Sequence, residues 1–235
     1  MSKGSKLGEM PMGRLVFSMS LPLMISLLVQ SLYNIVDSIF VARLSETALT
    51  ATSLAYPVQL LMIAVSVGTS VGINALLSKS ISAGEKDTTT NAADTGVLLA
   101  LIGMAVFLLL GLTSTGLFVR LFTEDEIIAA DCAKYLRICM IFCGGTFIGT
   151  MYQRFLQSVG NAFDSMLTLI SGAVTNLILD PVMIFGLLCF PMLGIRGAAI
   201  ATVTGQWVSA TLAVFLNRRH NPAVQVSFKG FSFQN

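Results

Sequence analysis

The chain of 235 residues is 54% hydrophobic and only 11% charged, with a formal net charge of +2. Soluble domains average about 25% charged residues, so the composition excludes an ordinary soluble domain and favours a membrane protein. The basic residues stand near the ends of apolar segments and form no patch, so the sequence indicates no nucleic-acid partner.

Apolar segments long enough to cross a lipid bilayer recur along the chain. A spanning helix needs about 20 predominantly apolar residues. Four runs without Asp, Glu, Lys or Arg, and two runs interrupted by one Asp each, predict an all-α polytopic membrane protein with six transmembrane helices. The predicted spans are 15–41, 50–77, 95–118, 135–158, 163–188 and 195–216.

The six spans divide the chain into three parts: a polar lead-in at 1–14, a transmembrane lobe at 15–216, and a tail or linker at 217–235. We expect no cleavable signal peptide, because the first apolar run is too long and contains Asp37. Residues 79–94 predict a polar connection, and Thr123 is the expected cap of a short helix with an acidic first turn.

Six spans place both termini on one side of the membrane. Nine Lys and Arg residues fall on that side and five on the other, which predicts cytoplasmic termini by the positive-inside bias. The nine are Lys3, Lys6, Arg14, Lys79, Lys86, Arg154, Arg218, Arg219 and Lys229, and the five are Arg43, Arg120, Lys134, Arg137 and Arg196.

Two aspartates stand alone in apolar surroundings. Asp37 is the only Asp, Glu, Lys or Arg between Arg14 and Arg43, and Asp180 is the only one between Asp164 and Arg196. A charged side chain at the centre of a membrane helix costs about 2.5 to 3.5 kcal/mol on insertion scales. Both positions are therefore candidates for function.

A polar face precedes the first aspartate. Gln30, Tyr33, Asn34 and Asp37 follow the i, i+3, i+4, i+7 spacing of one helical face. A structural network of interhelical hydrogen bonds is the alternative explanation for the amides, although it explains the carboxylate poorly. Pro22 predicts a bend near Ser18 in the same span.

The second aspartate has an amide and a proline beside it. Asn176 lies one helical turn before Asp180, and Pro181 removes the hydrogen bond to the carbonyl of Leu177. Oxygen-rich sites at interrupted helices hold Na⁺ or H⁺ in transporters. A bend at Pro181 without an ionic role is the alternative.

The two aspartates are predicted to meet, because spans one and five run in the same direction and each aspartate lies past the middle of its span. No Lys, Arg or His lies in the apolar cores to pair with them. Two adjacent carboxylates without a fixed cation must take up a proton or bind a mobile cation. The sequence thus predicts an H⁺ or Na⁺ site, with Na⁺ possible at Asp37, Asn176 and Asp180.

Enzymatic motifs are not supported. The segment from Gly68 to Gly72 fits the hydrolase pattern G-x-S-x-G, but Ser70 is mid-span and the sole histidine, His220, follows the last span. These glycines predict a helix-packing face, as do Gly145 with Gly149 and Gly197 with Gly205. The aspartate contexts do not match intramembrane aspartyl proteases, and the four cysteines have no metal-type spacing. We expect a protein that is not an enzyme and has no cofactor.

Several large apolar side chains are candidates for lining a cavity for organic cargo, because Met and Phe adapt to varied shapes. They are Met24, Met151, Phe155 and Met183.

The chain resembles the N-terminal lobe of a MATE (multidrug and toxic compound extrusion) transporter of the bacterial type. The resemblance runs from Met12 to Phe231 and is most specific from Gly160 to Gln206, with the sequence GNAFDSMLTLISGAVTNLILDPVMIFGLLCFPMLGIRGAAIATVTGQ. Span one agrees through Leu21-Pro22 and through Asp37-Ser-Ile-Phe-Val.

The resemblance implies twelve helices in two lobes and efflux of drugs or other organic compounds, often cationic, by antiport with H⁺ or Na⁺ in the bacterial inner membrane. It places the cation site at Asp37, Asn176, Asp180 and Thr202, and it associates Pro22 with bending of the first helix. The required partners are the bilayer, a small organic substrate and a second six-helix lobe, from the same gene or from another copy of the chain.

Two alternatives remain open. A lipid-linked oligosaccharide flippase has the same fold, but such proteins often carry basic residues in the cavity, which this chain lacks. A non-transporting membrane assembly subunit is the other alternative, because the second lobe is absent from this sequence.

Overall fold

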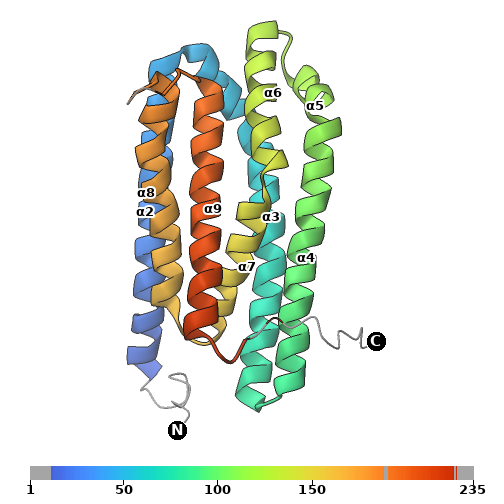
Figure 1. Ribbon diagram of the computed structural model, residues 1–235, viewed down its shortest axis with the longest axis vertical. Coiled ribbons are helices and arrows are strands. Elements are labelled where there is room, and N and C mark those ends of the chain that lie inside the picture. The colour runs from blue at the N-terminus through green and yellow to red at the C-terminus, as the bar shows by residue number, and fades with distance from the viewer. Residues whose placement is uncertain (1–11, 188–189, 225, 227–235) are drawn as a thin grey trace.

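The computed structural model describes residues 12–187, 190–224 and 226, and all regular structure in these ranges is α-helical. Five helices are long and apolar enough to cross a membrane. They stand side by side in Figure 1 and correspond to predicted spans one, two, three, five and six: α2 (Met12–Leu44), α3 (Glu46–Ala83), α4 (Lys86–Thr113), α8 (Ala162–Phe185) and α9 (Ile195–His220).

The fourth predicted span is not one continuous helix. It consists of α6 (Glu126–Ile141) and α7 (Gly144–Ser158), which follow one another end to end (Figure 1). A Cβ on Gly145 would lie 2.9 Å from the backbone nitrogen of Trp207 in α9. The glycine pair at the start of α7 therefore permits close packing against α9, and glycine weakens a continuous helix by about 1 kcal/mol per residue.

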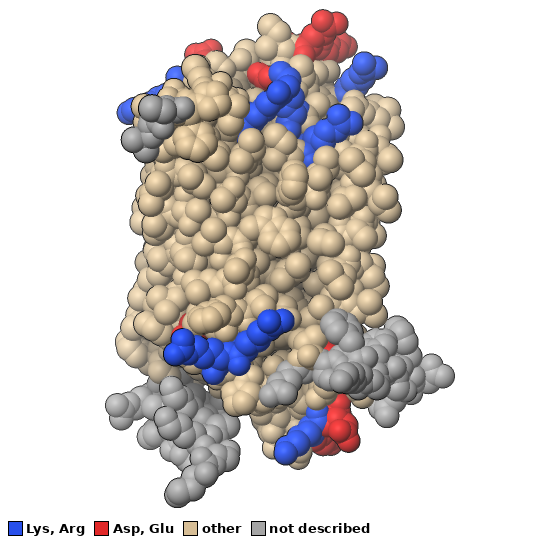
Figure 2. Space-filling view, viewed as in Figure 1, with Lys and Arg blue, Asp and Glu red and all other residues tan. Residues whose placement is uncertain are grey.

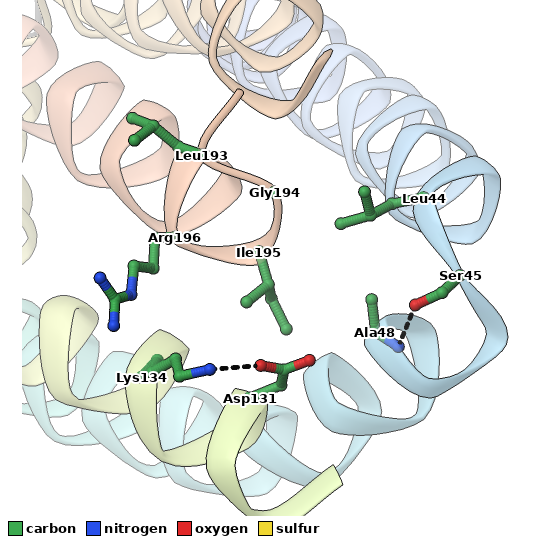
Figure 3. Close-up of a pocket in the computed structure, with 9 residues that line it drawn as sticks. All are labelled: Leu44, Ser45, Ala48, Asp131, Lys134, Leu193, Gly194, Ile195 and Arg196. Carbon is green, nitrogen blue, oxygen red and sulfur yellow. Dashed lines mark hydrogen bonds and ion pairs between the residues drawn. The ribbon is translucent and has the colours of Figure 1, made fainter. Parts of the chain in front are cut away.

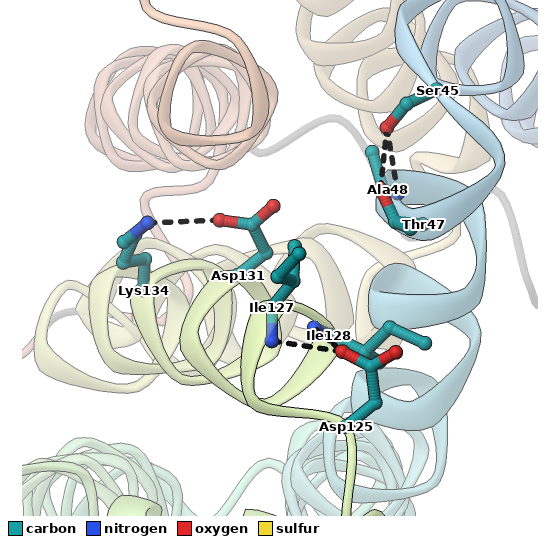
Figure 4. Close-up of polar contacts among 8 residues, drawn as sticks. All are labelled: Ser45, Thr47, Ala48, Asp125, Ile127, Ile128, Asp131 and Lys134. Carbon is teal, nitrogen blue, oxygen red and sulfur yellow. Dashed lines mark hydrogen bonds and ion pairs between the residues drawn. The ribbon is translucent and has the colours of Figure 1, made fainter.

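The predicted connections are shorter and more helical than expected. Residues 79–94 are not an extended polar loop, because α3 continues to Ala83 and α4 begins at Lys86. A short helix, α5 (Thr115–Phe122), follows α4. The cap of α6 is Asp125 rather than Thr123, since the Asp125 carboxylate accepts hydrogen bonds from the amides of Ile127 (2.8 Å) and Ile128 (3.1 Å; Figure 4).

The bundle has two polar ends. We call the end where α2 begins and α9 ends the terminal face, and the opposite end, with the α2–α3 turn and the start of α6, the far face (Figure 1). In Figure 2, Lys, Arg, Asp and Glu gather at these two ends and a belt of other residues separates them. This distribution matches a lobe embedded in lipid, where apolar side chains face outward.

Burial differs sharply among the helices. In the most apolar 18-residue stretch of α2, only 6% of the residues are buried inside the bundle, whereas the corresponding share is 39% in both α8 and α9. Glycines bring α8 and α9 together: a Cβ on Gly205 would lie 2.7 Å from the carbonyl oxygen of Gly172. The predicted packing role of Gly145, Gly149, Gly197 and Gly205 is confirmed, whereas a Cβ on Gly68 or Gly72 would meet no atom within 4 Å.

Candidate functional site

The two isolated aspartates meet between α2 and α8. Their carboxyl groups lie within hydrogen-bonding range of one another. Asp180 is fully buried, and Oδ1 of Asp37 is buried without a hydrogen-bond partner among the described residues. A hydrogen bond between two carboxyl groups requires that one of them carry a proton. The pair is thus arranged either to share a proton or to hold a cation between its oxygens.

Asn176 and Thr202 complete this cluster from α8 and α9. The Asn176 amide, 3% exposed, fits best with its nitrogen donating to Asp180 Oδ2 (3.0 Å) and its oxygen accepting from the Thr202 backbone amide (3.2 Å). The opposite orientation leaves its nitrogen 3.4 Å from both Asp180 Oδ1 and Thr202 Oγ1. The structure therefore brings together the four residues at which the family resemblance places the cation site.

The supporting polar face of α2 is only partly turned toward the carboxyl pair. Tyr33 is partly buried and lies near Asp37, Asp180 and Gln30. The Asn34 side chain is exposed on the bundle surface, so the structure separates it from the buried cluster. Tyr33 and Asn34 differ in this way because the polar face of four residues covers a wider part of the α2 surface than the part that packs against α8.

Two polar residues of the site were missed from sequence. Tyr135 of α6 is 4% exposed and lies close to Thr202 of the cluster and to Gln59 of α3. The Gln59 Nε2 atom donates to the Tyr135 hydroxyl at 3.4 Å. Gln59 and Asn74 are the two Asn and Gln residues in the charge-free run from Thr47 to Ser78, and this amide in an apolar run is the sequence signal that marks Gln59.

No fixed positive charge neutralises the carboxyl pair. Lys134 pairs with Asp131 and His220 with Asp164, and neither pair includes Asp37 or Asp180. Among the described residues, no three His, Cys, Asp or Glu side chains lie close enough together to hold a metal ion. The donor set is two carboxyl groups, one amide and hydroxyls, which suits H⁺ or Na⁺ better than a transition metal.

The prolines lie within continuous helices. Pro22 is inside α2, where its carbonyl oxygen accepts a hydrogen bond from the Ser26 hydroxyl (2.8 Å). Pro181 is inside α8, directly after Asp180. Neither proline ends its helix in this conformation.

The candidate cargo residues are dispersed. Met151 and Phe155 are 1% and 0% exposed and belong to the hydrophobic core of the bundle, so they line no open cavity in this conformation. Met24 is 60% exposed on α2, and Met183 is partly buried on α8. The structure therefore does not bring these four side chains together around one space.

A surface pocket of about 320 Å³ opens at the far face, between the α2–α3 turn, α6 and the start of α9. In Figure 3, Lys134 donates to Asp131 at 2.9 Å and Arg196 extends from the start of α9 on the same side. The pocket contains none of the four residues of the cation cluster.

Comparison with known proteins decides the family. The MatE family model matches residues 22–182, which is more than half of the chain. The chain belongs to the MatE family. Members of this family are transporters and not enzymes.

Two curated relatives illustrate the relationship. The chain is 28% identical over 206 residues to a FAD transporter of Shewanella oneidensis, covering 88% of this chain and 46% of the relative. It is 30% identical over 210 residues to the probable multidrug resistance protein YoeA of Bacillus subtilis, covering 87% and 45%. The chain thus spans about half the length of these relatives.

A solved structure of MATE in complex with MaL6 has the same architecture as this lobe. The TM-score is 0.91 at 26% sequence identity, and the superposition covers 100% of this chain and 52% of that one. The chain is therefore a multi-pass membrane protein whose described helices form half of a MATE fold.

Proposed function

We propose that this chain is one lobe of an exporter in which the exchange of H⁺ or Na⁺ at Asp37, Asn176, Asp180 and Thr202 drives the efflux of organic compounds. The observation that carries the proposal is the contact between the two carboxyl groups without a fixed cation. A buried pair of this kind is costly in a membrane, and a structural role would be filled more cheaply by two amides.

The proposed coupling depends on how α2 is held in the lobe. Among the helices, α2 packs mainly against α8, and most of its surface faces outward. With a proton or cation bound, the carboxyl pair links α2 to α8. When the site empties, two adjacent negative charges repel each other, which favours movement of α2 away from α8. Cation occupancy and the shape of the lobe are thereby linked.

The terminal face is assigned to the cytoplasm. The positive-inside bias of the whole sequence supports this orientation, with nine basic residues on that side and five on the other. The carboxyl pair then lies in the outer half of the membrane, since Asp37 precedes the end of α2 at Leu44 by about two helical turns. Cations would enter it from outside.

The complete exporter requires a second six-helix lobe, because the relatives are about twice as long as this chain. Their names indicate two kinds of cargo, multidrug compounds for YoeA and FAD for the Shewanella oneidensis protein. The described residues place no Lys, Arg or His beside the carboxyl pair, which favours neutral or cationic cargo near this lobe.

The test is transport in inside-out vesicles from cells that express the gene at its natural length. An imposed proton or sodium gradient should drive uptake of a cationic dye, and Asp37→Asn should abolish it with normal membrane insertion. Asp131→Asn, which changes a far-face carboxylate paired with Lys134, is the matched control and should retain uptake. Full uptake by the Asp37→Asn variant would contradict the proposed coupling to H⁺ or Na⁺. Uptake of FAD without uptake of any cationic dye would contradict the proposed cargo.

A further inference from the structure

Polar side chains continue along α9 from the cation cluster to the terminal face. Thr202, Gln206, Ser209, Asn217 and His220 lie on one side of the helix, within a sector of about 80° at 100° per residue. Ser209 and Asn217 are buried, 8% and 2% exposed. The stripe is interrupted between Ser209 and Asn217, where the buried Ala213 lies on the same face. A polar stripe on a membrane helix that is turned into the protein is unusual, because each buried polar group must find a partner.

Asn217 is bonded to Asn221 and Val224, beyond the end of α9, whereas α7 and α8 provide the partners of the other buried groups. The Gln153 Nε2 atom donates to the Ser209 hydroxyl at 3.2 Å, and both residues are buried. One turn further along α7, Gln157 donates to the hydroxyl of Ser165 on α8 at 2.8 Å. The first contact joins α7 to α9, and the second, nearer the terminal face, joins α7 to α8.

The stripe ends in an acid–base pair at the terminal face. The buried Asp164 accepts a hydrogen bond from Asn161 at 2.6 Å, and its Oδ2 lies 2.7 Å from Nδ1 of His220. The His220 side chain is 45% exposed, against 10% for Asp164. The histidine thus contacts the interior through one ring nitrogen and presents the rest of the ring to the solution.

Two buried oxygens near the upper end of the stripe have no protein partner. They are Gln206 Oε1 on α9 and Thr146 Oγ1 on α7, which lack a hydrogen bond among the described residues. Gly145, beside Thr146, is in close contact with the backbone of Gln206. Buried acceptors of this kind are normally satisfied by ordered water.

We propose that the seam between α7, α8 and α9 is a proton route from the Asp37–Asp180 pair to the terminal face, with His220 and Asp164 as its outlet. This inference rests on the proposed function, and it adds that the ion released toward the cytoplasm is H⁺. The members of the seam are Gln206, Ser209, Gln153, Gln157, Ser165 and His220.

The chemistry of the seam suits a proton and not Na⁺. Hydroxyls and water pass a proton by donating one hydrogen while accepting another, and the Gln amides hold them in position. Between the carboxyl pair and Asp164 the seam offers no carboxylate to coordinate Na⁺, and the glycine contacts of α9 with α7 and α8 leave little room for a hydrated ion. For each proton that leaves the carboxyl pair, one proton reaches the His220 ring along the seam and one passes from that ring to the solution, so the seam itself gains and loses none.

Three arginines lie near the Asp164–His220 pair at this outlet. Arg154 donates to the Gln157 side-chain oxygen at 2.6 Å, and Arg218 and Arg219 precede His220 on α9. Asp164 and His220 are distinguished from these arginines by their direct contact, 2.7 Å from Oδ2 to Nδ1, which joins a buried oxygen to a ring that reaches the solution.

The test follows the rate at which the carboxyl pair changes protonation. The whole chain, with a C-terminal affinity tag, is reconstituted into vesicles, and those with the terminal face outward are captured by the tag. After a jump in external pH, the carboxyl C=O infrared band is followed in time. Ser209→Ala and His220→Gln should slow the change about tenfold or more without altering its end point.

Two controls make the outcome decisive. Thr211→Val alters a hydroxyl on the exposed side of α9, and Arg219→Gln alters a charge beside the outlet, so neither should change the rate. Unchanged rates in both seam variants would overturn the route and leave the proposed function standing. A band that does not respond to Asp37→Asn would overturn the proposed function, and the route with it.

Discussion

Two buried carboxyl clusters, one toward each end of the lobe, have opposite surroundings. Asp164 near the terminal face has a histidine and an asparagine as partners, at 2.7 and 2.6 Å. Asp180 in the other half of the lobe has Asp37 and neutral groups around it. Burial alone therefore does not mark an ion site. The distinguishing feature is a buried carboxyl group whose charge no protein cation balances, so that a mobile ion must do so.

The largest expected effect separates these two clusters directly. Asp180→Asn should reduce gradient-driven export to the level of cells without the gene, because the pair can no longer exchange a cation. Asp164→Asn should slow export but not abolish it, since the carboxyl pair remains intact. Initial rates of dye efflux at matched expression are the measurement. Equal losses in the two variants would erase the proposed difference between the clusters.

A large effect on stability is expected where α8 and α9 cross. Gly205→Leu should lower stability by about 1 to 3 kcal/mol or more, because its side chain would overlap the carbonyl of Gly172. Gly72→Leu on α3 is the matched control, since nothing lies within 4 Å of that position. Thermal unfolding in detergent measures both. A stable Gly205→Leu protein would show that this contact is looser than described.

A smaller effect is expected at the edge of the cation cluster. Tyr135→Phe removes the hydrogen bond that the Tyr135 hydroxyl accepts from Gln59, worth about 1 kcal/mol, and should weaken the dependence of export on the cation about fivefold. The cation concentration or pH that gives half-maximal export is the measurement. Tyr56→Phe, at an exposed tyrosine of α3, should leave that value unchanged.

The smallest effect is expected at the far-face ion pair. Lys134→Gln breaks the bridge to Asp131, whose side chains are 41% and 24% exposed. Exposed pairs contribute about 0 to 1 kcal/mol, so thermal stability should change little and export should continue. A strong loss of export would show that the pocket in Figure 3, which contains this ion pair, takes part in transport.

Much of the fold can be predicted from the order of apolar and polar residues along the chain. The length of the apolar runs predicts α2, α3, α4, α8 and α9, because the bilayer thickness sets the length of a spanning helix. The break between α6 and α7 was not predicted, since hydropathy does not register the close approach of Gly145 to α9. The cap of α6 was placed two residues early for a similar reason, because both Thr123 and Asp125 are good caps and geometry decides between them.

The sequence by itself determined the spans, the family resemblance and the isolation of Asp37 and Asp180, because a charge in an apolar run is costly wherever the run packs. Only the tertiary structure decided which polar groups surround that pair. It brought in Tyr135 and Gln59, left Asn34 outside, and joined Ser209 to Gln153 and Asp164 to His220. Such contacts depend on the rotation and depth of each helix against its neighbours, which side-chain packing between helices sets.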